Sequence, residues 1–289
     1  MKRRTLLSLL SIGAAEFLVG CASGSAPGNQ PTRRPVPLAA GPTQEAVPVG
    51  VGAAGPTTWS TSAPSAGPLP PVPPPHPGRP TVVSRAPRRT RQIALTIDDG
   101  YSPETVAAYV AFAQRTRIPI TFQPNGCYQA IWNRHATVLR PLVEAGQVQI
   151  GNHTWTHHNL LARGRSDADI RADVERNEQW IQRTFGITSR PWFRPPYGSH
   201  NVHVDGVVAE AGFTKIMMWN GSFGDSTPLS PEQLMGLARQ YLQPGTIMIG
   251  HANHPTITGL FDQVEALIEQ RQLEPVTLDT MFGTSRATG

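Results

Sequence analysis

The chain has 289 residues, and its charge is spread unevenly along it. The formal net charge is +5, but from residue 91 onward we count 16 lysine and arginine residues against 18 aspartate and glutamate residues, a balance of −2. The basic excess therefore lies in the first ninety residues, and it gives no support for nucleic-acid binding.

Residues 1–21 have the pattern of an export signal. A basic start, Met1-Lys2-Arg3-Arg4, precedes an apolar segment that is too short to span a bilayer easily. The segment ends in Leu18-Val19-Gly20-Cys21, which resembles a bacterial lipobox. This resemblance implies cleavage before Cys21 and a lipid on its thiol, so we expect an exported lipoprotein anchored to the outer face of the cell membrane. The alternative is an ordinary signal peptide and a secreted protein.

Residues 22–90 are dominated by Pro, Gly, Ala, Ser and Thr, most densely between Pro68 and Pro75. This segment shows neither helical nor strand periodicity, and it holds too little apolar surface to offset the entropy of ordering it. We therefore predict a disordered, Pro-rich tether between the export signal and a folded domain.

Residues 91–289 are predicted to form that domain, because short apolar segments alternate there with amphipathic ones. Strands are expected at 93–98, 120–123, 148–151, 192–194, 215–219, 246–250 and 276–278. Helices are expected at 104–117, 136–145, 167–185, 204–211, 231–241 and 260–270. Such alternation is typical of an α/β fold with parallel strands.

Two polar motifs follow predicted strands and together suggest a metal site. Asp98 and Asp99 close the first apolar run before Gly100, and His153 and His157 stand four residues apart after the third. Two histidines at this spacing can reach one ion, and one aspartate completes three protein ligands with a position left open for water. Either motif alone is more often a solvated turn. The zincin motif requires Glu after the first histidine, but Thr154 stands there, so a metalloprotease is not indicated.

Two further motifs lie downstream, Phe193-Arg194-Pro195-Pro196-Tyr197-Gly198 and Ile247-Met248-Ile249-Gly250-His251. With these, the segment 91–289 resembles the polysaccharide deacetylases of carbohydrate esterase family 4, the NodB-like domain. The resemblance implies a distorted (β/α) barrel with fewer than eight complete units, with its active site at the carboxyl ends of the strands.

The resemblance also implies a role for each motif residue. In this family pattern Asp99, His153 and His157 hold a divalent metal, usually zinc, and Asp98 is the general base. His251 matches the general acid, Arg194 matches the arginine that holds the base, and the backbone N–H near Tyr197 matches an oxyanion donor. The chemistry is consistent, because a metal lowers the pKa of water and histidine titrates near neutral pH.

One segment departs from the family pattern. Where relatives commonly have Asp-x-x-Asp-Trp, this chain keeps only the second aspartate, Asp225, followed by Ser226. We expect Asp225 to hydrogen-bond His251 and raise its pKa, because a nearby negative charge favours imidazolium. The missing tryptophan alters one wall of the acetyl pocket. Of the remaining histidines, His254 is the best candidate for a substrate contact.

The sequence therefore predicts a metal-dependent deacetylase of N-acetylated amino sugars in a cell-wall or extracellular polysaccharide, such as peptidoglycan or a chitin-like chain. One alternative is a carbohydrate-binding lipoprotein that has lost turnover. Another is an O-deacetylase of xylan-type glycans, which would use the same residues. The sequence implies no nucleic acid and no protein partner.

Overall fold

The computed structural model describes residues 76–284. The predicted export signal, the lipobox cysteine and most of the predicted tether lie outside this range. The described strands are β1 (Thr81–Val83), β2 (Gln92–Asp99), β3 (Ile120–Pro124), β4 (Val148–Ile150), β5 (Trp192–Phe193), β6 (Lys215–Met217), β7 (Gly221–Ser222), β8 (Ile247–His251) and β9 (Glu274–Pro275). The α-helices are α1 (Pro103–Thr116), α2 (Gln129–Trp132), α3 (Ala136–Glu144), α4 (Asp167–Phe185), α5 (Val202–Glu210), α6 (Pro231–Tyr241), α7 (Phe261–Gln270) and α8 (Leu278–Phe282).

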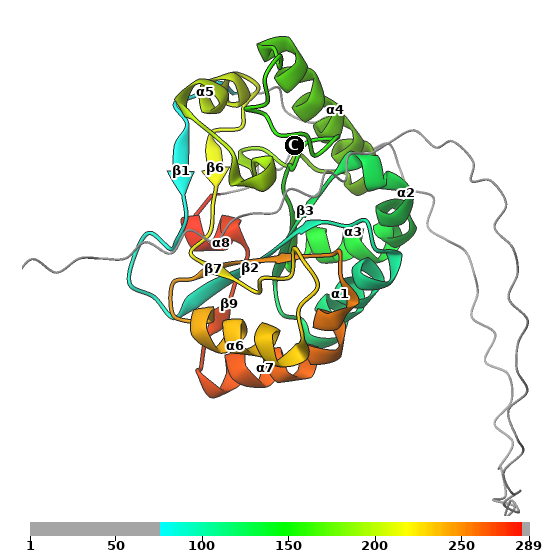
Figure 1. The fold of residues 1–289 in the computed structure, drawn as a ribbon, viewed down its shortest axis with the longest axis vertical. Helices are drawn as coiled ribbons and strands as arrows, with labels where there is room; N and C mark the ends of the chain where they lie inside the picture. The colour runs from blue at the N-terminus through cyan, green and yellow to red at the C-terminus, as the bar shows by residue number, and fades with distance from the viewer. Residues whose placement is uncertain (1–75, 285–289) are drawn as a thin grey trace, which may run out of the picture. The chain divides into compact units, whose positions relative to one another are not determined.

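The strands form two sheets in which all of the paired strands are parallel. One sheet has the order β4-β3-β2-β8-β7, with β9 also paired to β2, and the other has the order β1-β6-β5. Two isolated bridges join the sheets, a parallel one from Asn152 to Phe193 and an antiparallel one from Arg85 to Thr246. The helices lie around the outside of the strands (Figure 1). The result is the expected distorted α/β barrel.

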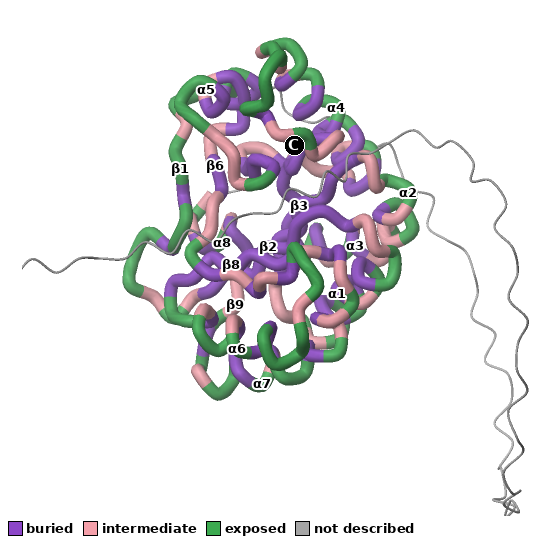
Figure 2. Tube along the Cα trace, viewed as in Figure 1, coloured by how far each residue is buried: buried purple, intermediate pink, exposed green. Residues whose placement is uncertain are grey.

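The centre of the barrel is built from nearly continuous apolar strands. In β2 every residue after Gln92 is buried, as in a parallel strand covered on both faces. Figure 2 shows β2, β3 and β8 as a buried middle within more exposed helices. The largest core cluster joins Ile93, Leu95 and Ile97 of β2 to the inner faces of the surrounding helices.

The helix boundaries follow from local signals in the sequence. Ser166 and Ser230 begin α4 and α6 with capping boxes, in which each serine side chain accepts a backbone N–H of the first turn. Gly186 ends α4 in the left-handed conformation, with φ of 74°. As a result, α4 and α6 occupy the predicted ranges 167–185 and 231–241.

The fold differs from the sequence prediction near both ends of the domain. Strand β1 lies inside the segment predicted to be a tether, where it pairs with β6 and buries Val83, so the folded part begins before residue 91. The strand expected at 276–278 is wrong, because Thr277 caps a helix that starts at Leu278, and the strand β9 ends at Pro275. Within residues 76–284, no helix is long and apolar enough to cross a membrane.

Candidate active site

The candidate catalytic residues meet at the carboxyl ends of neighbouring strands. Asp98 and Asp99 end β2, and His251 ends β8, where it stands opposite Asp98 in the register of the two strands. His153 follows β4 and Arg194 follows β5. Because the strands are parallel, all of these residues come to one end of the barrel.

A backbone turn allows the two neighbouring aspartates to face one site. Asp99 has a φ of 69°, in the left-handed region, and Gly100 has a φ of 112°. Adjacent side chains of a regular strand point to opposite faces, so this departure from strand geometry is what brings Asp99 to the same side as Asp98. The indole of Trp132 donates a hydrogen bond of 3.0 Å to the carbonyl of Asp99 and holds the turn.

Asp99, His153 and His157 form a compact cluster of potential metal ligands. The Oδ1 atom of Asp99 lies 3.4 Å from Nε2 of His153 and 3.3 Å from Nε2 of His157. Among the described residues these three form the one group of at least three His, Cys, Asp or Glu side chains that could hold a metal ion. Four ligands at about 2.0–2.1 Å from a tetrahedral ion lie about 3.3–3.4 Å from one another, so the observed separations fit a divalent metal.

Electrostatics and hydrogen bonding also suit this cluster to a cation. Oδ1 of Asp99 is buried and accepts no hydrogen bond. Burial opposes the charge of Asp99, but the imidazoles of His157 and His153 outweigh burial and hold its pKa well below the usual value. Burial lowers the pKa of His157 to about 4, so that its ring is neutral at physiological pH. Neutral imidazoles and a carboxylate are the forms that bind metal.

The ring of His153 is oriented by a backbone contact. Its Nδ1 atom lies 2.7 Å from the carbonyl oxygen of Arg194, which leaves Nε2 to face Asp99. This is the usual arrangement for a metal-binding histidine, in which the second nitrogen donates to a carbonyl and fixes the ring.

A buried polar network holds the loop that carries both histidines. Thr154 and His157 have positive φ angles of 67° and 57°, so the loop is not helical. Asn125 donates to the carbonyls of His153 and Thr154, and Asn152 accepts the Thr154 backbone N–H at 2.9 Å. The i,i+4 spacing thus brings the two rings together in a loop, with centroids 4.9 Å apart.

Asp98 lies beside the metal-ligand cluster and is held through one oxygen only. Arg194, which is fully buried, donates to Oδ2 of Asp98 at 3.0 Å and to the hydroxyl of Thr96 at 2.9 Å. Oδ1 of Asp98 is buried and has no hydrogen-bond partner. Arg194 also lies over the ring of Trp219, 5.0 Å from its centroid.

His251 and Asp225 form a close pair on the other side of Asp98. The Nδ1 atom of His251 lies 2.9 Å from Oδ1 of Asp225, and the backbone N–H of His251 donates to Oδ2. Burial lowers the pKa of His251, but the hydrogen bond and charge of Asp225 outweigh burial and raise it to about 9. The imidazolium is therefore the dominant form at neutral pH, and Nε2 is left to act on a substrate.

Tyr197 lies next to the metal-ligand cluster, on the side of His157. Its ring centroid is 4.6 Å from that of His157, its φ is 59°, and its side chain is exposed. The structure thus brings all eight of the sequence-predicted site residues to one end of the barrel.

Asn253 is a residue of the site that sequence reasoning missed. It is buried, its Nδ2 donates to Oδ2 of Asp99 at 2.7 Å, and its Oδ1 accepts the backbone N–H of Gly100. It thereby ties the loop after β8 to the turn after β2. The sequence places Asn253 two residues after His251, and only the pairing of β2 with β8 shows which aspartate it meets.

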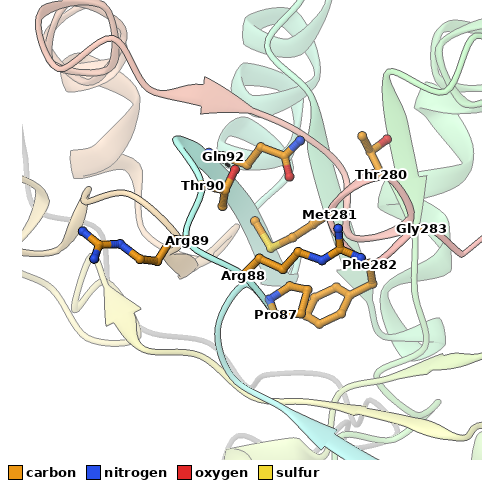
Figure 3. Close-up of a pocket in the computed structure, with 9 residues that line it drawn as sticks. All are labelled: Pro87, Arg88, Arg89, Thr90, Gln92, Thr280, Met281, Phe282 and Gly283. Carbon is orange, nitrogen blue, oxygen red and sulfur yellow. Dashed lines mark hydrogen bonds between the residues drawn. The ribbon is translucent and has the colours of Figure 1, made fainter.

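One pocket lies away from this cluster, at the amino-terminal end of β2. It has a volume of about 380 Å³ and is lined by the segment before β2 and by the end of α8 (Figure 3). Arg88 lies along Phe282 in this view, and Arg89 points away from the other labelled residues. Gln92, which lines the pocket, is the first residue of β2, whereas Asp98 and Asp99 are at the other end of that strand. This pocket is therefore separate from the candidate active site.

The architecture defines the chain as an α/β barrel with a candidate metal site at the carboxyl ends of its strands. Residues 85–216 match the family model described as polysaccharide deacetylase. This match spans just under half of the chain, and together with the relatives it supports a polysaccharide deacetylase domain there.

The relatives include both characterised and uncharacterised proteins. The chain is 27% identical over 190 residues to an uncharacterized protein of Streptomyces coelicolor, covering 66% of this chain and 71% of that protein. It is 24% identical over 202 residues to the peptidoglycan-N-acetylglucosamine deacetylase PgdA of Listeria monocytogenes, covering 70% of this chain but only 41% of the relative. The match therefore spans about two fifths of the Listeria enzyme.

A solved structure confirms the fold. The crystal structure of a carbohydrate esterase family 4 pseudoenzyme from Bacillus anthracis superimposes with a TM-score of 0.61 at 20% identity, and the match covers 72% of this chain and 71% of the other. At this identity the similarity establishes the fold and leaves the activity of this chain to its own residues.

Proposed function

We propose that this chain is a metal-dependent hydrolase that removes acetyl groups from N-acetylated amino sugars in a cell-wall or extracellular polysaccharide, such as peptidoglycan or a chitin-like chain. The single observation that carries this proposal is the state of Asp98. One of its buried oxygens is fixed by Arg194, and the other, Oδ1, has no hydrogen-bond partner beside a cluster suited to a cation. A buried carboxylate oxygen without a partner is costly unless a ligand or a reacting group uses it.

In this mechanism Asp99, His153 and His157 hold the metal, which we expect to be zinc. A divalent metal bound there would supply Lewis-acid chemistry, lowering the pKa of water and polarising the acetyl carbonyl. Oδ1 of Asp98 takes a proton from the attacking water as its oxygen bonds to the acetyl carbon. Arg194 keeps Asp98 oriented, because it contacts the base oxygen that does not react.

The acid side of the reaction is assigned to His251. As the carbon–nitrogen bond breaks, imidazolium Nε2 gives its proton to the departing amine, and acetate and the free amino sugar result. Asp225 keeps His251 protonated and oriented. The backbone N–H of Tyr197 is our candidate donor to the oxyanion, a contact that is typically worth about 3 kcal/mol in the transition state.

We further propose that the protein is exported and acts outside the cytoplasm. The Listeria relative is described as a peptidoglycan deacetylase, which supports a site of action at the cell wall. We propose a lipid on Cys21, which lies outside the described residues, as the membrane anchor. Mass spectrometry of the N-terminal peptide tests this, and an unmodified Cys21 in the membrane-bound protein would exclude the anchor.

A second candidate function is carbohydrate binding without turnover. The similar Bacillus anthracis structure is described as a pseudoenzyme, so this fold also occurs without activity. Asp98 argues against that alternative here, because a protein that only binds sugar has no need of a base beside the metal ligands. A third candidate, O-deacetylation of xylan-type glycans, would use the same residues and differs only in substrate.

The test is acetate release by the zinc-loaded chain from three substrates: N-acetylglucosamine oligomers, peptidoglycan and acetylated xylan. We expect release from one of the N-acetylated substrates and none by Asp98→Asn. Release from xylan alone would replace N-deacetylation by ester hydrolysis. No release from any of the three, with one zinc bound per chain, would favour the binding protein.

A further inference from the structure

We propose that Tyr101, Tyr128 and His254 form a second sugar-binding position beside the metal-ligand cluster, which takes the pyranose ring next to the acetylated sugar. This inference rests on the proposed function, because it extends the substrate from one sugar to a chain.

The three side chains come from loops above adjacent strands. Tyr101 follows β2, Tyr128 ends the short 3-10 turn after β3, and His254 follows β8. These strands are neighbours in the order β3-β2-β8. The histidine loop follows β4, which is the neighbour of β3, and Tyr197 follows β5 of the other sheet.

The rings form one continuous aromatic surface, which we call the aromatic wall. The Tyr101 ring lies 6.1 Å from that of Tyr128, tilted by 58°, and 5.8 Å from that of His254 in an edge-on arrangement. The hydroxyl of Tyr101 lies 3.1 Å from Nε2 of His254. All three residues are half-buried, so part of each is open to solvent.

Their distance from the reacting centre is short. Tyr101 is two residues from Asp99, just after the end of the strand that carries both aspartates. Burial, with the charge of Asp99 and the neighbouring Tyr101 and Tyr197, raises the pKa of Tyr128 to about 12. The phenol of Tyr128 therefore stays neutral and remains a hydrogen-bond donor at physiological pH.

The chemistry of the aromatic wall fits a neutral sugar ring. A pyranose ring offers an apolar C–H face to an aromatic ring and hydroxyl groups to its polar edge, and tyrosine combines an apolar body with a polar tip. None of the three residues carries a fixed positive charge, so the aromatic wall has no cation to recognise an anionic group. In a polymer substrate, the ring that lies here is the neighbour of the sugar whose acetyl group reaches the metal.

The experiment measures binding separately from turnover. The full chain carrying Asp98→Asn and loaded with zinc is titrated calorimetrically with N-acetylglucosamine and its tetramer. We expect the tetramer to bind more tightly than the monomer, and we call the ratio of the two dissociation constants the gain. Tyr101→Leu should reduce this gain about tenfold, which corresponds to about 1.4 kcal/mol. A second variant, His254→Ala, should shrink it about threefold.

The matched control is Tyr241→Leu, at the end of α6, where the tyrosine packs against the core. It should keep the gain from monomer to tetramer. The inference is overturned if Tyr101→Leu keeps the gain, if Tyr241→Leu loses as much, or if no variant binds the tetramer. Acetate release without dependence of tetramer binding on Tyr101 would contradict the role of the aromatic wall and support the deacetylase function. Tetramer binding that depends on Tyr101, without acetate release by the native chain, would support the aromatic wall and contradict the deacetylase function.

Discussion

Asp225 is predicted to control the pH range in which the chain is active. His251 must be protonated to act as an acid, so activity should fall at alkaline pH as His251 loses its proton. The hydrogen bond and charge of Asp225 help to raise the pKa of His251 from 6.5 to about 9. Asp225→Asn keeps the shape of the side chain and removes its charge, so the pKa of His251 should fall and the alkaline limb should move to lower pH.

The size of this effect follows from the two pKa values. At pH 8, a group with a pKa of about 9 is about 90% protonated, whereas one with a pKa of about 6.5 is about 3% protonated. If the variant loses the whole shift, its rate at pH 8 should fall about thirtyfold relative to the native chain, while the loss at pH 6 should be less than about twofold. In the variant, burial still lowers the pKa of His251 and the charges of Asp98 and Asp99 still raise it, so thirtyfold is the loss for a return of the pKa to its ordinary value.

The assay is acetate release by both proteins between pH 5 and 10, with metal content measured on each sample. We expect equal metal content, because the carboxylate of Asp225 hydrogen-bonds His251, which is not one of the three proposed metal ligands. An alkaline limb at the same pH in both proteins would refute the role of Asp225. A rate reduced equally at every pH would show that Asp225 acts on structure and leaves the pKa of His251 unchanged.

Two further variants test how the metal ligands are held. Asn253→Ala removes the 2.7 Å hydrogen bond to Asp99, and it should weaken zinc binding about tenfold or more in a competition titration with a chelating dye; unchanged affinity would rule out a positioning role. Gly100→Ala would place a Cβ 2.3 Å from the indole nitrogen of Trp132, and it should lower the free energy of unfolding by about 2 kcal/mol more than Gly146→Ala. Gly146 also has a positive φ, of 72°, but has open space around it, so equal losses in thermal or urea unfolding would contradict the importance of this packing.

The sequence predicted much of the fold because local signals and long-range packing agree there. The apolar run of β2 is typical of a parallel strand that is buried on both faces. The capping box at Ser166 and the left-handed Gly186 set the limits of α4. Strand β1 was missed because its three residues are held by pairing with β6, and this contact has no local signal. Residues 276–278 were assigned to a strand because the apolar pattern is too short to separate a strand from the first turn of α8.

For the site, the sequence predicted the residue types and the structure adds their connections. The motif Asp98-Asp99 identified a base and a ligand, but only the left-handed turn at Asp99 explains how both face one site. The contact between His251 and Asp225 was expected from the resemblance, and the 2.9 Å separation agrees with it. The sequence singled out His254, but Asn253 and the grouping of Tyr101 and Tyr128 with His254 could not be predicted, because these contacts are made by the order of the strands.

The central claim is that two adjacent aspartates have different tasks, Asp99 as metal ligand and Asp98 as base. The most direct measurement is the zinc content and acetate release of Asp98→Asn and Asp99→Asn, prepared side by side with the native chain. We predict that Asp98→Asn keeps one zinc per chain and releases no acetate, whereas Asp99→Asn loses most of its zinc. Zinc lost from Asp98→Asn and kept by Asp99→Asn would reverse the two roles, and acetate release by Asp98→Asn at the native rate would contradict the mechanism.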